Sequence, residues 1–259
     1  MKSFLAILAT CLLSAQPLVS EANVLSDISV INRSTGERLP LYAHAGKLYI
    51  AGKPGDRYAI ELRNRTGERV LTVVSVDGVN VLSGETAAAS QSGYVLSPGG
   101  VTEIAGWRKS DRDVAAFYFT ALPDSYAART ARPDNVGVIG VATFREYREP
   151  PPVVYDNAMS RKSESMAGGL AREAAPASAP AMDARAAQAD KKLGTGHGER
   201  IYSQTQRVEF RRASATPDEV ISIQYDSFRN LVALGVIPKV RTQHAPQPFP
   251  GDGYVPDPS

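Results

Sequence analysis

Cysteine, histidine and tryptophan are scarce in this sequence of 259 residues, which contains one Cys, three His and one Trp. The single cysteine, Cys11, excludes a disulfide framework within the chain and any zinc site built from several cysteines. Zinc sites need three or four ligands at defined spacings, whereas His44, His197 and His244 are scattered along the sequence. We therefore predict no metal site and no cofactor.

Neither sign of charge dominates, because 29 Lys and Arg residues against 27 Asp and Glu residues leave a net charge of +2. Nucleic-acid binding depends on clustered positive charge, so this balance disfavours a nucleic-acid partner. Long apolar runs are also absent: no segment approaches the roughly 18 consecutive apolar residues of a membrane-spanning helix. We predict no transmembrane segment in this chain.

Residues 1–22 have the three parts of a secretory signal peptide. Met1-Lys2 gives a positive start, residues 4–13 form a short apolar run, and Ser20-Glu21-Ala22 matches the small-x-small cleavage pattern. We predict that the mature chain begins at residue 23 and that the protein is periplasmic or secreted. The alternative is a lipoprotein signal, in which Cys11 becomes the lipid anchor.

Residues 23–148 carry the pattern of short β-strands. Apolar and charged residues alternate over residues 58–62, and residues 70–76 are rich in valine. The pair Asp77-Gly78 then precedes another apolar run, which is typical of a tight hairpin. Further strands are expected at residues 101–104, 114–120 and 136–144. Short strands separated by turn residues predict a mainly β fold, an antiparallel β-sandwich-like domain.

Two later segments have compositions that disfavour a packed core. Residues 149–192 are rich in Ala and Pro and contain few bulky apolar residues, so we predict a disordered linker. Residues 239–259 hold five prolines, and we predict a disordered tail.

Residues 193–238 between them predict a small ββα unit. Alternation indicates strands near residues 207–211 and 221–225, followed by a short helix that Asp226 or Ser227 can cap. A unit of this size buries too little apolar surface to be stable alone. We therefore expect it to dock on the first domain or on another chain.

Two loops supply the candidate binding residues, Trp107 with Arg108 and Tyr126 with Arg129. An exposed Trp beside a cation suits stacking on a sugar ring or anchoring a protein interface. The alternative is a buried Trp folded over the edge of the sandwich. Tyr126 and Arg129 either contact a ligand together or hold a long connection in place through hydrogen bonds.

No catalytic residue is predicted. The chain lacks the G-x-S-x-G pattern of a nucleophile elbow. The glycine-rich residues 194–198 lack the preceding strand and following helix of a dinucleotide-binding loop, so we expect a flexible entry into the ββα unit. Asp77 is assigned to the hairpin turn.

Several blocks carry a resemblance to a known group of proteins. They are GKLY at 46–49, GKPGDRY at 52–58, LRNRT at 62–66, VSVDGVNV at 74–81, DSYAAR at 124–129, NVGVIG at 135–140, LGTGHG at 193–198, YDS at 225–227, NLV at 230–232 and GVI at 235–237. Together they resemble uncharacterised exported proteins of Gram-negative bacteria. The resemblance implies a location in the bacterial envelope or outside the cell, and it implies no activity and no functional residue.

Three functions are compatible with these features. The first is a non-enzymatic interaction or structural protein of the bacterial envelope, with an envelope protein as partner and strand addition at an open sheet edge as the mode of binding. The second is a carbohydrate-binding module that recognises envelope glycan through an exposed Trp107. The third is a hydrolase whose catalytic residues are too dispersed to recognise. We favour them in that order.

Overall fold

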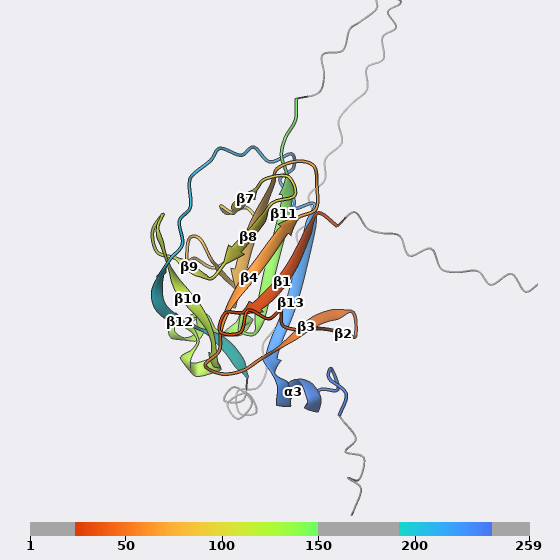
Figure 1. The fold of residues 1–259 in the computed structure, drawn as a ribbon, viewed down its shortest axis with the longest axis vertical. Coiled ribbons are helices and arrows are strands. Elements are labelled where there is room, and N and C mark those ends of the chain that lie inside the picture. Colours follow the sequence, from red (N-terminus) through yellow and green to blue (C-terminus); the bar gives the residue numbers. More distant parts are fainter. Residues whose placement is uncertain (1–23, 150–191, 240–259) are drawn as a thin grey trace, which may run out of the picture.

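The computed structural model describes residues 24–149 and 192–239, which form two β-sheets with a shared core (Figure 1). The predicted mainly β, sandwich-like fold is therefore confirmed. The predicted signal peptide, Cys11, almost all of the predicted linker and the predicted tail lie outside the described residues.

The first sheet is antiparallel throughout and has the strand order β1-β4-β10-β12. Two short strands extend it, because β8 pairs with β4 and β9 pairs with β10. The bounds are β1 Ser26–Asn32, β4 Arg57–Asn64, β8 Val101–Ile104, β9 Gly106–Arg108, β10 Asp113–Ala121 and β12 Leu193–Tyr202.

The second sheet has the order β2-β3-β13-β11-β5-β6, with β7 paired to β5. It is mixed, because β13 and β3 run parallel. The bounds are β2 Leu41–His44, β3 Lys47–Gly52, β5 Val70–Val76, β6 Val79–Asn80, β7 Tyr94–Leu96, β11 Val138–Arg145 and β13 Glu219–Ser227. The helices are short: η1 Leu122–Asp124, α1 Tyr126–Arg129, η2 Pro133–Asn135 and α3 Phe228–Ala233.

Aromatic side chains fill the core between the sheets. The Tyr58 ring on β4 stacks on Phe117 and Phe119 of β10, with ring centroids 5.3 and 4.3 Å away. Tyr225 on β13 approaches Phe119 from the opposite sheet at 5.4 Å. Offset stacking of this kind adds about 0.5–1.5 kcal/mol per pair beyond the burial of apolar area. The alternation predicted for residues 58–62 therefore points one face of β4 into this core.

The tight hairpin predicted at Asp77-Gly78 is present between β5 and β6. Asp77 has a φ of 54° and Gly78 a φ of 73°, as a two-residue turn with both residues in the left-handed region requires. A Cβ at position 78 would also collide with the side chain of Asn135. Glycine is thus needed at position 78 for conformation and for space.

The C-terminal segment differs from the predicted ββα unit. β12 joins the first sheet beside β10, whereas β13 lies between β3 and β11 in the second sheet, so the segment is part of the sandwich of its own chain. The strand expected at residues 207–211 is instead irregular, and the expected flexible entry at residues 194–198 is strand. The reason is steric. A Cβ at Gly194 would lie 2.6 Å from the Cβ of Ser125, and one at Gly198 would lie 2.8 Å from the carbonyl oxygen of Ala116, so glycine is required at these two positions despite its low β propensity.

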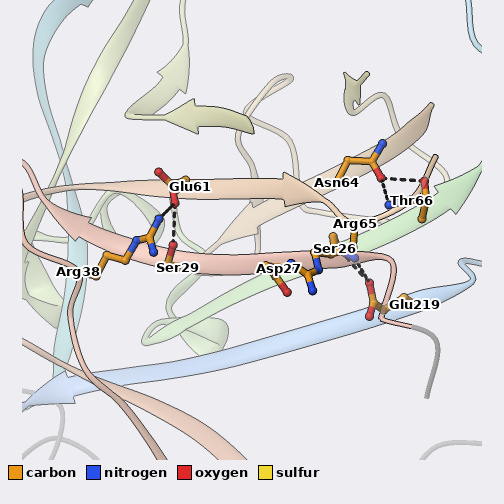
Figure 2. Close-up of polar contacts among 9 residues, drawn as sticks. All are labelled: Ser26, Asp27, Ser29, Arg38, Glu61, Asn64, Arg65, Thr66 and Glu219. Carbon is orange, nitrogen blue, oxygen red and sulfur yellow. Dashed lines mark hydrogen bonds and ion pairs between the residues drawn. The ribbon is translucent and has the colours of Figure 1, made fainter. Parts of the chain in front are cut away.

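Polar contacts close one side of the sandwich, where β1 of the first sheet meets β13 of the second (Figure 2). The backbone N–H and the hydroxyl of Ser26 donate to Glu219 Oε2 at 3.0 and 2.8 Å. The Ser26 hydroxyl also shares a hydrogen bond with that of Thr143 on β11, at 2.9 Å. One serine therefore joins both sheets.

A buried chain of hydroxyls joins the sheets at a second place. Asp77, fully buried, accepts hydrogen bonds from the N–H groups of Gly137 and Thr195 and from the hydroxyl of Tyr225. Because the Tyr225 proton is used on Asp77, the Thr195 hydroxyl must donate to Tyr225 at 2.6 Å, and the Tyr58 hydroxyl must donate to Thr195 at 2.7 Å. This chain fixes β12 against β13 and the β5–β6 hairpin.

Candidate functional site

Three rings from three separate elements meet at one end of the first sheet. Trp107 comes from β9, Tyr126 from α1 and His197 from β12. The Trp107 and Tyr126 ring centroids are 4.8 Å apart, and the His197 ring lies 5.3 Å from Tyr126 and 6.2 Å from Trp107. We call these rings, together with Lys109, Arg129 and Arg200, the aromatic–basic cluster.

Strand pairing brings Trp107 and His197 together. Trp107 is paired with Ala115 on one side of β10, and His197 is paired with Phe117 on the other side. The small Ala115 side chain leaves room for the indole, which packs edge-on against Phe117 at 4.8 Å. Residues distant in sequence therefore become neighbours through β10.

A short helix positions Tyr126. Ser125 caps α1 by accepting a hydrogen bond from the N–H of Ala128 at 3.2 Å, and its hydroxyl donates to Leu122 O at 2.7 Å. The guanidinium of Arg132 lies over the Tyr126 ring at 5.9 Å. Tyr126 is partly exposed. The predicted polar loop is therefore an ordered helical turn that places this ring beside Trp107.

The four sequence-predicted site residues do not form one site. Trp107 is only 2% exposed, so it matches the buried alternative and offers no stacking face to a ligand. Arg108 points elsewhere and donates to the Tyr94 hydroxyl at 3.1 Å. Tyr126 and Arg129 lie in the aromatic–basic cluster, with Arg129 exposed. Sequence reasoning missed His197, because the glycines around it indicate a loop.

The cluster is electropositive. Partial burial lowers the pKa of His197, and the nearby charges of Lys109, Arg129 and Arg200 lower it further. These three cations are exposed, and none of them makes an ion pair with another described residue. The adjacent Glu199 is already paired with Arg57 at 2.7 Å. The cluster therefore presents unpaired positive charge suited to an anionic group.

The cluster borders an open strand edge. β12 is the terminal strand of its sheet and pairs only with β10. On its other side, the N–H of Leu193 donates to Asp226 Oδ1 at 3.3 Å and that of Thr195 donates to Asp77 Oδ2 at 2.8 Å. No such partner is present among the described residues for the outer edge of residues 197–202. Figure 1 shows β12 at the margin of the molecule.

A second charged group, on the outer face of β1 and β4, is mostly paired within itself. Glu61 accepts hydrogen bonds from Arg38 and from the Ser29 hydroxyl, and Arg65 lies 3.5 Å from Asp27 (Figure 2). The cavity at this place is small, about 270 Å³. Both carboxylates here are already paired, and only Arg63 has no ion pair among the described residues, so this group is a weaker candidate for a binding site than the aromatic–basic cluster.

Within residues 24–149 and 192–239, no three His, Cys, Asp or Glu side chains are grouped so as to hold a metal ion. No helix in the same ranges is long and apolar enough to cross a membrane.

Comparison of the chain with protein-family models, with curated proteins and with solved structures finds no match. The resemblance to exported proteins of Gram-negative bacteria therefore stays a prediction from sequence.

Proposed function

We propose that this chain is an exported, non-enzymatic interaction protein of the bacterial cell envelope, which binds an acidic protein segment along the open edge of β12. One observation carries the proposal. Arg200 lies within the unpaired edge of residues 197–202, Lys109 and Arg129 lie near enough to His197 on this strand to lower its pKa, and none of the three makes an ion pair with the described residues.

Strand addition would use the unpaired edge of β12 and the three cations together. An extended segment placed beside β12 would form backbone hydrogen bonds with the free N–H and C=O groups of the edge, which supply affinity for any sequence. Acidic side chains of the same segment would pair with the three cations, which supply specificity and a faster association. Six edge residues span about 20 Å, at roughly 3.3 Å per residue.

The interaction function is supported by a different feature of the molecule than the one that suggested it in the sequence. The predicted ββα unit was expected to dock on the first domain or on another chain, and β12 and β13 are stabilised within the sandwich of their own chain. Export rests on the N-terminal residues and on the resemblance. The interaction rests instead on the edge and charge of β12.

The glycan alternative loses its main support, because the indole of Trp107 is buried. Tyr126 and His197 remain partly exposed, so binding to an acidic glycan becomes an outcome of the test below.

A photo-crosslinking residue in place of Tyr202 tests the edge directly. Tyr202 is at the end of β12 and is 71% exposed, and Leu234, which is 62% exposed and follows α3, provides the matched control. The mature chain, residues 23–259, is returned to a bacterial envelope extract and irradiated. We expect one protein to crosslink from position 202 and not from position 234.

Charge reversal then tests the cations. The variant K109E/R129E/R200E should lose the crosslink, whereas K47E/K53E/R229E, which changes three other exposed cations, should keep it. Equal labelling from both positions, or a crosslink that survives the first variant, would contradict the proposal. Retention on the sedimented cell wall without a protein crosslink would replace the protein partner with a glycan.

A further inference from the structure

A large cavity lies away from the aromatic–basic cluster, under the connection between β12 and β13. We call residues 203–218 the strap and the cavity beneath it the strap groove. The groove has a volume of about 710 Å³, and its walls come from β5, β7, β9 and the strap. Its lining includes Leu71, Leu82, Tyr94, Val95, Arg108 and Phe210. Figure 1 shows the strap running along one side of the sandwich, from the end of β12 to β13.

The strap is held at both ends of the groove. Near β12, the N–H of Thr205 donates to Asp111 O at 2.9 Å. Near β13, Arg212 donates to Ala89 O at 2.9 Å, and its guanidinium lies 4.0 Å from the centre of the Phe144 ring. The groove is therefore formed before any ligand arrives, which reduces the entropy lost on binding.

One end of the groove is polar and contains the guanidinium of Arg108, which makes no ion pair with the described residues. The Arg108 guanidinium is partly buried, lies over the Tyr94 ring at 5.9 Å and donates to the Tyr94 hydroxyl and to Ser203. All of these acceptors are neutral, and Arg108 Nε is buried without a hydrogen-bond partner among the described residues. Burial of an uncompensated charge is unfavourable, so an anion at this position would be bound tightly.

The other charges of the groove do not neutralise Arg108. Asp111 also lines the cavity, but it is paired with Arg207 at 3.7 Å. Arg108 and Arg207 against Asp111 leave one positive charge in excess. A carboxylate carries the single negative charge that would balance this excess.

The rest of the lining is apolar. Leu71, Leu82 and Val95 form the wall of the groove on the side of the sheet, and Val208 and Phe210 form the wall on the side of the strap. Small-molecule sites have volumes of about 300–1,000 Å³ and combine apolar walls with a few polar groups that orient the ligand. The strap groove has this composition and size.

We propose that the strap groove binds a small amphipathic carboxylate, with its carboxylate on Arg108 and Tyr94 and its apolar tail between β5–β7 and the strap. This site is separate from the β12 edge and does not depend on the function proposed there. Ligand binding would add contacts between strap and sheet, so it would also stabilise the folded chain.

Decanoate is a suitable probe, and decanol is its matched control without the charge. Calorimetric titration of residues 23–259 should show decanoate binding at least about tenfold more tightly than decanol, because a hydrogen bond to a charged group contributes roughly 1.5–3 kcal/mol. Arg108→Met should remove this preference, while Arg108→Lys should keep part of it. Arg211→Met, which changes an exposed strap cation stacked on Tyr147, should leave it unchanged.

A second variant does not touch the polar contacts. Val208 lines the groove and is 55% exposed, so Val208→Trp fills the apolar part without disturbing the core and should weaken decanoate and decanol alike. Equal affinity for the two probes in the unaltered chain, a preference that survives Arg108→Met, or no binding of decanoate would each overturn the proposal. The variant K109E/R129E/R200E should bind decanoate normally, which separates this site from the β12 edge.

Discussion

Asp77 and Thr195 are 118 positions apart, and the carboxylate of Asp77 accepts a hydrogen bond from the backbone N–H of Thr195 at 2.8 Å. Both residues are fully buried, and no cation contacts the carboxylate among the described residues. The bond joins the β5–β6 hairpin to β12. It also closes the outer edge of β12 at the point where the open edge begins.

The first prediction concerns this carboxylate. Asp77→Ala would leave the N–H groups of Gly137 and Thr195 and the hydroxyl of Tyr225 without their acceptor, at about 1–3 kcal/mol for each buried group. We expect the free energy of unfolding in urea to fall by at least about 3 kcal/mol. The exposed Asp124→Ala should change it by less than about 0.5 kcal/mol. An equal effect of both variants would contradict the role of Asp77.

The second prediction is the pH dependence of the same group. Burial raises the pKa of Asp77 above its ordinary range, and its hydrogen bonds offset only part of that effect. The folded-state pKa thus exceeds the unfolded value of about 3.9. The contribution of Asp77 to stability is therefore fully present below about pH 3.9 and is lost as pH rises through the folded-state pKa.

Asp77→Asn removes this titration and provides the comparison. The free energy of unfolding of both chains is measured across pH. As pH rises from about 3.9 through the folded-state pKa of Asp77, the unaltered chain should lose stability relative to Asp77→Asn. A difference that moves the other way would mean that hydrogen bonding outweighs burial at Asp77.

The third prediction concerns His197. Burial and the charges of Lys109, Arg129 and Arg200 lower its pKa, so NMR titration should place it below the ordinary value of about 6.5. Its contribution to stability is present above about pH 6.5 and is lost as pH falls through the folded-state pKa. K109E/R129E/R200E should raise the pKa, and K47E/K53E/R229E should not. An unchanged pKa in the first variant would show that the three cations do not act on the ring.

The fourth prediction concerns the approach of β9 to β10. A Cβ at Gly106 would overlap the carbonyl oxygen of Ala115, which belongs to the backbone and has no side-chain freedom to move away. Gly106→Ala should therefore lower the free energy of unfolding by about 1–3 kcal/mol and change the fluorescence of the neighbouring Trp107. Gly67, where a Cβ meets nothing within 4 Å, is the matched control, and Gly67→Ala should have little effect on either measurement.

Part of the fold was predictable because its signals are local. Strand β5 coincides with the valine-rich run at residues 70–76, and the Asp77-Gly78 pair forms the predicted hairpin. Ser227, one of the two expected caps, caps α3 by accepting from the N–H of Asn230. In each case a few neighbouring residues decide the conformation, through alternation, a positive φ or a single side-chain hydrogen bond.

The candidate site was predictable only in part. Tyr126 and Arg129 share a helical turn, as their spacing suggests, and the buried alternative for Trp107 matches the structure, but His197 was assigned to a flexible loop. The glycines of β12 explain that error, because they serve close packing against β10 and its neighbours rather than flexibility. The burial of Trp107 depends on Ala115 and Phe117, which sequence spacing does not place next to it.

Sequence alone determined the mainly β class, the Asp77-Gly78 hairpin and the segments with little core-forming material, since these follow from residue type and short-range pattern. Tertiary structure alone decided that β12 and β13 enter different sheets, that Asp77 is a buried acceptor shared by three donors, and that three cations without ion pairs surround the His197 ring of β12. The physical reason is that these properties depend on which distant backbone segments pair. That pairing is chosen by packing and hydrogen bonding over the whole core, which no local stretch of sequence specifies.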